Sequence, residues 1–174
     1  MPNWKIGVIT ASDTIAKGER EDDRVQILRE LAREWLQADV AVYRIVPDDM
    51  EELKEQMIEL VDRDKCDLLI VTGGTSLSPR DVTPEVTSWV IDRVVPGLAE
   101  EMRRAALQQS RRAMLTRAVA GTRGNSLIIN LPGSPRGVEI CFTAIADMIP
   151  DALNILQGTG DANENWGSPS GSQA

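Results

Sequence analysis

The chain has 174 residues, of which 42% are hydrophobic and 26% are charged. This profile is typical of a single soluble globular domain, and a chain of this size buries roughly 70% of its unfolded surface on folding. Acidic residues outnumber basic ones by 27 to 19, which gives a net charge of −8. We therefore expect neither nucleic acid nor an anionic membrane as a partner, because both attract a basic surface.

The chain contains no histidine. This excludes serine and cysteine nucleophiles activated by histidine, and also histidine zinc sites. Cys66 and Cys141 lie far apart among apolar residues, so we predict two reduced, buried thiols. No apolar run approaches the ~18 residues of a membrane span, and the first residues lack the pattern of a signal peptide. These features indicate a cytoplasmic protein.

Predicted strands and helices alternate along the chain. Short β-rich runs predict strands at residues 4–10, 40–46, 66–72, 118–120 and 126–131, with a turn between the last two. A polar loop is expected at 11–22. Apolar residues at helical spacing predict helices at residues 25–36, 50–61, 98–107 and 135–156, and another that begins with Thr83 as N-cap and Pro84 as its first residue.

This order of elements predicts an α/β fold with a mainly parallel sheet and helices on both faces. Trp35, Trp89 and the apolar face of residues 98–107 are interpreted as parts of the core, with an interface between chains as the alternative. The folded domain is predicted to cover residues 1–158. Residues 159–174 are rich in glycine, serine, asparagine and aspartate, and we expect them to form a disordered tail.

Ligands of such sheets bind beside the carboxyl ends of the strands. The loop after the third predicted strand runs from Thr72 through Gly73, Gly74 and Thr75 to Ser76. Its two glycines let the backbone approach a ligand closely, and its amides and hydroxyls form a candidate anion site. The alternative is a plain tight turn. The loop is no P-loop, because it lacks the lysine of that motif.

The other loops at this edge also carry polar residues. Asp48 and Asp49 precede a helix, where one serves as a cap and the other is free to bind a hard metal ion. Ser12-Asp13-Thr14 follows the first predicted strand and is a candidate ligand-binding loop, with a turn or a helix cap as the alternative. The Pro132–Pro135 segment offers a helix N-terminus with one hydroxyl. Glu100 is either a ligand-binding residue or the partner of Arg103, three residues later on one helix.

These segments together resemble the molybdopterin-binding family of molybdenum-cofactor biosynthesis, which includes the bacterial molybdopterin adenylyltransferases and a domain of gephyrin-like proteins. The resemblance extends over nearly the whole chain to about residue 158. It is carried by residues 8–14, 72–85, 96–103, 115–121 and 127–135, and most specifically by Thr72-Gly73-Gly74-Thr75, Arg80-Asp81-Val82-Thr83-Pro84 and Leu131-Pro132-Gly133-Ser134 in that order.

The resemblance implies a three-layer α/β/α sandwich, usually a homotrimer. The implied reaction transfers AMP from ATP to the terminal phosphate of molybdopterin with Mg²⁺ and releases pyrophosphate, and a molybdate-inserting enzyme then acts on the product. By position, Asp48 and Asp81 are the expected catalytic and metal-binding residues. The substrate-binding residues implied in the same way are Ser12, Asp13, Thr72, Gly73, Gly74, Thr75, Ser76, Arg80, Glu100, Thr116, Gly133 and Ser134.

Two positions depart from the family pattern. Ser76 stands where the family usually has glycine, which adds a Cβ at a position where a positive φ is expected, and Thr116 replaces a serine. The implied nucleophile is a phosphate oxygen that is already ionised at neutral pH, so the reaction requires no histidine base. Two alternatives stay open: a pterin-binding carrier or scaffold without turnover, and an α/β nucleotide-binding protein unrelated to molybdenum.

Overall fold

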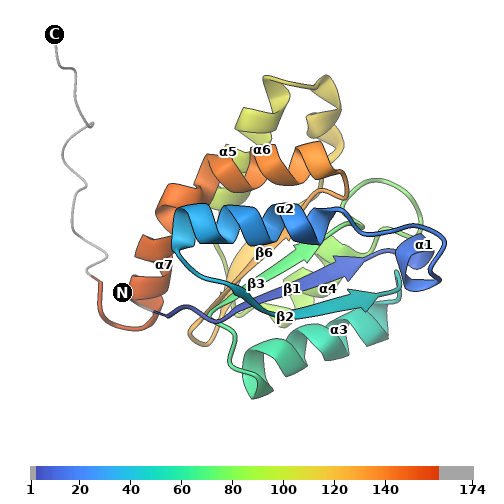
Figure 1. The fold of residues 1–174 in the computed structure, drawn as a ribbon. Helices are drawn as coiled ribbons and strands as arrows, with labels where there is room; N and C mark the ends of the chain where they lie inside the picture. The colour runs from blue at the N-terminus through green and yellow to red at the C-terminus, as the bar shows by residue number, and fades with distance from the viewer. Residues whose placement is uncertain (1–2, 161–174) are drawn as a thin grey trace, which may run out of the picture.

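The computed structural model describes residues 3–160 as a three-layer α/β/α sandwich (Figure 1). Its six-stranded sheet has the order β2-β1-β3-β6-β5-β4. Strands β2, β1, β3 and β6 are parallel, whereas β5 and β4 run antiparallel to their neighbours, so the predicted mainly parallel sheet is confirmed. The strands are β1 (Ile6–Ala11), β2 (Val40–Val46), β3 (Leu68–Thr72), β4 (Arg93–Val94), β5 (Ala120–Arg123) and β6 (Ser126–Leu131).

Helices cover both faces of the sheet (Figure 1). One face packs against α2 (Arg24–Leu31), α5 (Pro96–Leu107), α6 (Pro135–Ile145) and α7 (Ile149–Leu156), and the other against α3 (Met50–Ile58) and α4 (Thr83–Val90). The remaining helical segments are α1 (Asp13–Ala16), η1 (Ala32–Leu36), η2 (Glu59–Arg63), η3 (Arg111–Leu115) and η4 (Ala146–Met148).

The continuous apolar strands follow from this double coverage. Successive side chains of a strand point to opposite faces, and Ile70 of β3 joins the core under α2, α5 and α6 while Leu69 and Val71 join the core under α3 and α4. Because both faces of such a strand are buried, nearly all of its side chains are apolar, and a polar side chain there needs a hydrogen-bond partner. This explains why the core residues are predictable from the sequence.

Some predicted details are wrong. A short helix, α1, occupies part of the expected loop at 11–22, and Ser12 caps it by accepting a hydrogen bond from the amide of Ile15 at 3.3 Å. Thr83 is the first residue of α4 and not its N-cap. Trp89 is 69% exposed and Trp35 is 38% exposed, so neither is the core residue that we expected.

The strand register brings four loops to one edge. Ala11 pairs with Val46, Thr10 with Thr72, and Thr72 with Leu131. The parallel strands β2, β1, β3 and β6 therefore end side by side, and their arrowheads point toward the end of the sheet where α1 lies (Figure 1). We call this end the carboxyl edge.

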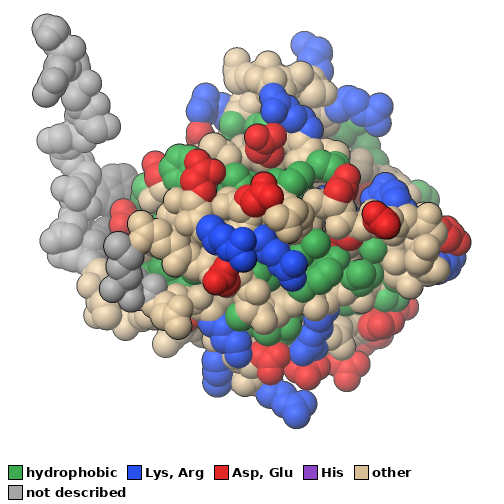
Figure 2. Space-filling model, in the orientation of Figure 1, with side chains coloured by type: hydrophobic (Ala, Val, Ile, Leu, Met, Phe, Trp, Pro, Cys, Tyr) green, Lys and Arg blue, Asp and Glu red, His purple; other side chains and the backbone are tan. Residues whose placement is uncertain are grey.

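Basic and acidic side chains are interspersed on the face shown in Figure 2. Within residues 3–160, no helix is both long and apolar enough to cross a membrane. The predicted tail at 159–174 lies outside the described residues, apart from Thr159 and Gly160, whose amides hydrogen-bond to the carbonyl of Asn154.

Candidate active site at the carboxyl edge

Asp13 and Asp48, which follow the neighbouring strands β1 and β2, form two reciprocal hydrogen bonds at the carboxyl edge. The amide of Asp13 donates to Oδ2 of Asp48 at 3.1 Å, and the amide of Asp48 donates to Oδ1 of Asp13 at 3.0 Å. Arg80 closes the group from the β3–α4 loop, because its Nε and Nη2 donate to the two carboxylate oxygens of Asp13 at 3.0 and 3.1 Å. Three loops are therefore joined by one set of charged hydrogen bonds.

The side chain of Asp48 is free to bind a ligand because Asp49 caps the helix. Oδ1 of Asp49 accepts from the amide of Glu52 at 2.9 Å. In the part of the chain that the structure describes, the buried Oδ1 of Asp48 has no hydrogen-bond partner, and neither has the buried hydroxyl of Thr83. Both atoms face Gly74, since a Cβ built there would lie 3.1 Å from Oδ1 of Asp48 and 2.6 Å from Oγ1 of Thr83. Gly74 thus leaves space between two unsatisfied oxygen atoms.

The two carboxyl groups of the pair have opposite pKa shifts. Burial raises the pKa of Asp48, and the negative charges of Asp13 and Asp81 add to this effect despite the hydrogen bond from the Asp13 amide. Burial also acts to raise the pKa of Asp13, but hydrogen bonds from the Asp48 amide and from Arg80 outweigh it and hold that pKa below its usual value. Asp81 lies in the β3–α4 loop, which follows β3 at this same edge, so both predicted catalytic aspartates lie on the carboxyl edge.

The β3–α4 loop is held in shape by Asp81 and Arg117. Oδ2 of Asp81 accepts from the amide of Ser76 at 2.7 Å. Arg117 donates from Nε to the carbonyl of Ser76 at 2.8 Å and from Nη2 to the carbonyl of Asp81 at 2.9 Å. Its Nη1 pairs with Glu85. Sequence reasoning missed Arg117, although it directly follows Thr116.

The glycines of this loop, but not Ser76, need left-handed backbone. Gly73 and Gly74 have φ values of +95° and +63°. Within residues 3–160, Gln37 and Lys65 are the non-glycine residues with positive φ, so the expected strain at Ser76 is absent. Replacement of glycine by serine at this position therefore costs no backbone strain.

The loop after β6 lies against the loop after β3. The hydroxyl of Thr72 donates to the carbonyl of Pro132 at 2.7 Å, and the amide of Gly73 donates to the carbonyl of Leu131 at 3.0 Å. Ser134 caps α6 by accepting from the amide of Gly137 at 3.1 Å. The carbonyl of Gly133 accepts a hydrogen bond from Arg24. The sequence does not single out Arg24, because nothing distinguishes this residue from other charged residues at a helix start.

Thr116 and Glu100 differ in their relation to this edge. The amide of Arg117, next to Thr116, donates to the carbonyl of Thr75 at 2.8 Å, which places Thr116 near the β3–α4 loop. Glu100 is exposed on α5, and within the described residues no hydrogen bond or ion pair joins it to the carboxyl edge. It does not pair with Arg103 either, whose Nη1 donates to the carbonyl of Ala118 at 3.1 Å. Its role stays a prediction.

The oxygen atoms around Gly74 fit Mg²⁺ only in part. Among residues 3–160, no three His, Cys, Asp or Glu side chains are placed to hold a metal ion by themselves. Mg²⁺ commonly keeps several waters and binds through one or two carboxylates together with substrate phosphates. The Oδ1 of Asp48 is without a partner among the described residues, and Asp81 lies nearby, so this edge can supply the one or two carboxylates that Mg²⁺ needs.

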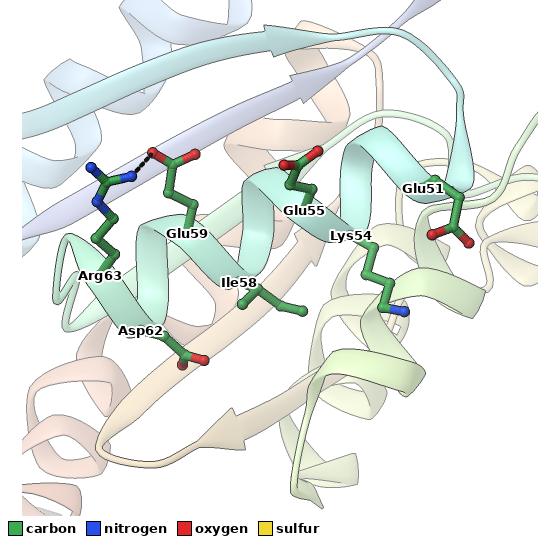
Figure 3. Close-up of a pocket in the computed structure, with 7 residues that line it drawn as sticks. All are labelled: Glu51, Lys54, Glu55, Ile58, Glu59, Asp62 and Arg63. Carbon is green, nitrogen blue, oxygen red and sulfur yellow. Dashed lines mark ion pairs between the residues drawn. The ribbon is translucent and has the colours of Figure 1, made fainter.

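A separate hollow of about 530 Å³ lies along α3 and η2 (Figure 3). Four of its seven lining side chains are acidic and two are basic: Glu51, Lys54, Glu55, Ile58, Glu59, Asp62 and Arg63. They project from one helical segment, and Arg63 pairs with Glu59 at 3.5 Å (Figure 3). Because its lining is mainly acidic and excludes the carboxyl-edge residues, this hollow is a poor phosphate site.

Comparison with known proteins identifies the family. The family described as "Probable molybdopterin binding domain" matches residues 7–151. The chain is 38% identical over 159 residues to a protein of Helicobacter pylori named molybdopterin adenylyltransferase, covering 91% of this chain and 90% of that protein. It is 34% identical over 175 residues to the Escherichia coli K12 protein of the same name, covering 91% and 88%.

A solved structure agrees with these relatives. The crystal structure of the molybdopterin biosynthesis enzyme MoaB from Thermus thermophilus superposes with a TM-score of 0.85 at 41% identity and covers 90% of this chain and 98% of that one. The fold, the four loops at the carboxyl edge and the family match agree with one another. This chain therefore belongs to the molybdopterin-binding domain family of molybdenum-cofactor biosynthesis.

Proposed function

We propose that this chain is a molybdopterin adenylyltransferase, which transfers AMP from ATP to the terminal phosphate of molybdopterin and releases pyrophosphate. The observation that carries the proposal is the convergence of Asp48, Asp81 and the Gly73-Gly74 turn at one edge of the sheet. Its support from comparison is that relatives matching about nine-tenths of the chain bear that enzyme's name.

The reaction needs alignment and charge neutralisation more than acid–base catalysis. An ionised oxygen of the pterin phosphate attacks the α-phosphorus of ATP, the new P–O bond forms, and the bond between the α-phosphorus and the bridging oxygen breaks as pyrophosphate leaves. No proton has to be removed from the nucleophile at neutral pH, which agrees with a chain that lacks histidine. Holding the two polyanions in line supplies most of the catalysis in such transfers.

The residues at the carboxyl edge divide these tasks. We assign the Gly74 amide and the Thr75 and Ser76 hydroxyls to phosphate binding, because the Gly73 amide is already bonded to the carbonyl of Leu131. Asp48 and Asp81 would hold Mg²⁺, which when bound neutralises charge on the triphosphate. Arg80 is already paired with Asp13, so its first task is to hold the loops together.

The Asp81→Asn variant tests this assignment. Purified chain is incubated with molybdopterin, ATP and Mg²⁺, and adenylyl-molybdopterin and pyrophosphate are measured. The variant is expected to bind the pterin but to lose at least about 100-fold in turnover, a typical effect of removing a charge that acts on the transferred group. Asp92→Asn is the matched control, because Asp92 also accepts one backbone amide at 2.7 Å, from Gly124.

The outcomes separate the alternatives. Full activity of Asp81→Asn contradicts the assignment of Asp81. Pterin binding by the unmodified chain without release of pyrophosphate indicates a binding-only carrier. ATP binding that is indifferent to pterin indicates a nucleotide-binding protein of another kind.

Assembly and location complete the proposal. We propose a homotrimer, supported by the exposed apolar residues Trp89 and Val94, which are 69% and 61% exposed in the isolated chain. We place the reaction in the cytoplasm, where ATP is available. The product is expected to pass to an enzyme that inserts molybdate.

A further inference from the structure

Arg24, the first residue of α2, is a buried cation. It is 2% exposed and is one of the largest fully buried side chains of the protein. Its Nε donates to Oδ1 of Asp22 at 3.0 Å, and the Asp22 side chain is only 4% exposed. An arginine carries its charge at every accessible pH, so a charged guanidinium is held inside the protein beneath the carboxyl edge.

Asp22 anchors this arginine from one side. Its Oδ2 accepts hydrogen bonds from the hydroxyl of Thr10 at 2.5 Å and from the hydroxyl of Tyr43, and its Oδ1 also accepts from the amide of Arg24. Burial acts to raise the pKa of Asp22, but these hydrogen bonds outweigh it and keep the pKa below its usual value. The carboxylate is therefore ionised and fully bonded, and it fixes the direction of the guanidinium.

The other end of the guanidinium lies against the two glycine turns. Its Nη1 donates to the carbonyl of Gly133 at 3.1 Å. A Cβ built on Gly73 would lie 3.0 Å from this nitrogen, and one built on Gly133 would lie 3.3 Å from it. The head of Arg24 is thus placed where the loops after β3 and β6 meet. We assign the first of these loops to phosphate binding, and the second carries Gly133 and Ser134, which the family resemblance implies as substrate-binding residues.

One nitrogen of this cation has no partner. Nη2 is buried and makes no hydrogen bond within residues 3–160. A buried polar group without a partner is destabilising, and more so when it is charged. Such a group in a folded protein calls for an explanation, and a ligand that completes the hydrogen bonds is one.

We infer that Arg24 is a substrate-binding residue whose Nη2 donates to a phosphate oxygen bound over the Gly73 and Gly133 turns. This inference rests on the proposed function for the identity of the phosphate, which belongs either to the pterin substrate or to ATP. The planar guanidinium suits phosphate oxygens in geometry and in charge. The absence of a side chain at Gly73 and at Gly133 lets both turns lie against this guanidinium, because a Cβ at these positions would lie 3.0 and 3.3 Å from its Nη1. Because Nη2 is buried, binding of phosphate requires these turns to move.

A purely structural role makes a different prediction. If Arg24 only holds Gly133 in place, its Nη1 is the atom required, and a folded Arg24 variant keeps the phosphate affinity of the unmodified chain. A binding role requires Nη2, which a lysine at the same position lacks. The two roles are therefore separated by the affinity for phosphate compounds and not by stability.

The first experiment measures binding without turnover. Inorganic phosphate, pyrophosphate, Mg-ATP and molybdopterin are titrated into the unmodified chain and into Arg24→Lys, which keeps the positive charge beside Asp22. We expect Arg24→Lys to weaken binding of pyrophosphate at least about 10-fold, the loss of one charged hydrogen bond. Arg33→Lys is the control, because Arg33 pairs with Asp39 on the surface and its side chain is 62% exposed.

The four ligands identify the source of the phosphate. Weaker binding of molybdopterin with unchanged Mg-ATP assigns Nη2 to the pterin phosphate, and the reverse assigns it to ATP. Equal affinities of Arg24→Lys and the unmodified chain for all four ligands overturn the inference, as does the absence of any binding. A chain that fails to transfer AMP but shows the Arg24-dependent affinity would refute the proposed function and leave this inference standing.

A second measurement needs no variant. In the unmodified chain labelled with ¹⁵N-arginine, the guanidinium N–H groups of a buried arginine exchange slowly and give separate signals. The slowest-exchanging set is assigned to Arg24, the arginine that is buried among residues 3–160. Addition of phosphate or pyrophosphate is expected to shift the Nη2 signal more than the Nε signal, which stays bonded to Asp22. Unshifted signals at saturating ligand contradict the inference even if Arg24→Lys does not fold.

Discussion

Asp48 combines two properties that oppose each other. Its proposed task requires a negative charge, yet burial and the charges of Asp13 and Asp81 make that charge unfavourable and raise the pKa. Among the described residues its Oδ1 has no hydrogen-bond partner, and neither has the hydroxyl of Thr83, which also faces Gly74. A bound cation, or a ligand with hydrogen-bond donors, would stabilise the Asp48 carboxylate. The same buried charge therefore destabilises the free protein and favours binding of the metal and substrate.

The Asp48→Asn variant should therefore be more stable but inactive. Because the folded-state pKa of Asp48 is raised, its favourable contribution is present when it is protonated, below the usual aspartate pKa, and is lost as pH rises through the raised pKa. Asparagine imitates the protonated form at every pH. We expect a melting temperature a few degrees above that of the unmodified chain at pH 7 and an equal one in acid.

Thermal unfolding between pH 4 and pH 8 checks this, with Asp49→Asn as the control. Asp49 only caps α3, and asparagine is an equally good cap, so its stability should change little at any pH. A pH-independent difference for Asp48→Asn would show that the charge of Asp48 is not the cause.

Gly74 is required both for its backbone and for the space around it. We expect Gly74→Ala to destabilise the protein by about 3 kcal/mol, because a Cβ would stand 2.6 Å from the Thr83 hydroxyl at a φ of +63°. Gly124→Ala is the matched control, since Gly124 also has a positive φ but no atom within 4 Å of the new Cβ, and it should lose only about 1 kcal/mol. Urea unfolding of both variants measures the difference, and equal losses would show that no crowding exists at Gly74.

Single residues also mark the limit of sequence reasoning. That one of Asp48 and Asp49 would be left free was predictable, because a helix start needs one cap. Arg24 was not predictable, since a charged residue in the first turn of an amphipathic helix is normally exposed. Its burial depends on Asp22, Thr10, Tyr43 and Gly133, which meet only in the folded protein.

The β3–α4 loop depends on contacts between elements. Its ends are fixed by the strand β3 and by α4, but Arg117, which follows η3, determines the position of its middle through the carbonyls of Ser76 and Asp81. The amide of Ser76 in turn holds the Asp81 carboxylate. A residue outside the loop therefore positions a proposed catalytic side chain within it.

We expect Arg117→Gln to lower kcat/KM by about 10-fold, equivalent to about 1.4 kcal/mol of transition-state stabilisation, through misplacement of Asp81. Arg104→Gln is the control, because Arg104 pairs with Glu101 on the exposed side of α5 and contacts nothing at the site. If Arg117→Gln melts lower but keeps full activity, its role is structural only.

At the level of elements, the sequence predicts what local patterns determine. The buried strands and amphipathic helices follow from apolar spacing and were placed to within a few residues. Strand β4 has only two residues and exists because it pairs with β5, and α1 depends on the cap at Ser12, so neither gives a recognisable pattern. Thr83 resembles an N-cap by type, but its hydroxyl faces Gly74.

At the scale of the whole molecule, the proposed active site and the proposed contact between subunits lie on different surfaces. The carboxyl edge contains the proposed site. Away from it, Trp89 is exposed on α4, and Val94 is exposed on β4, an edge strand of the sheet. Lys54 lies over the Trp89 ring with Nζ 3.5 Å from its centroid. A large, exposed aromatic residue such as Trp89 is typical of a surface that another chain covers.

We predict that sedimentation of the chain gives three times the monomer mass of 19.1 kDa, and that Trp89→Arg shifts the population toward the monomer. A charged side chain at the centre of an apolar contact loses burial and adds desolvation cost, which weakens association by several kcal/mol. Trp35→Arg is the matched control, because Trp35 is also exposed but belongs to η1, next to the opposite helical layer. A trimer unaffected by Trp89→Arg places the contact elsewhere, whereas a 19.1 kDa species of the unmodified chain removes the trimer altogether.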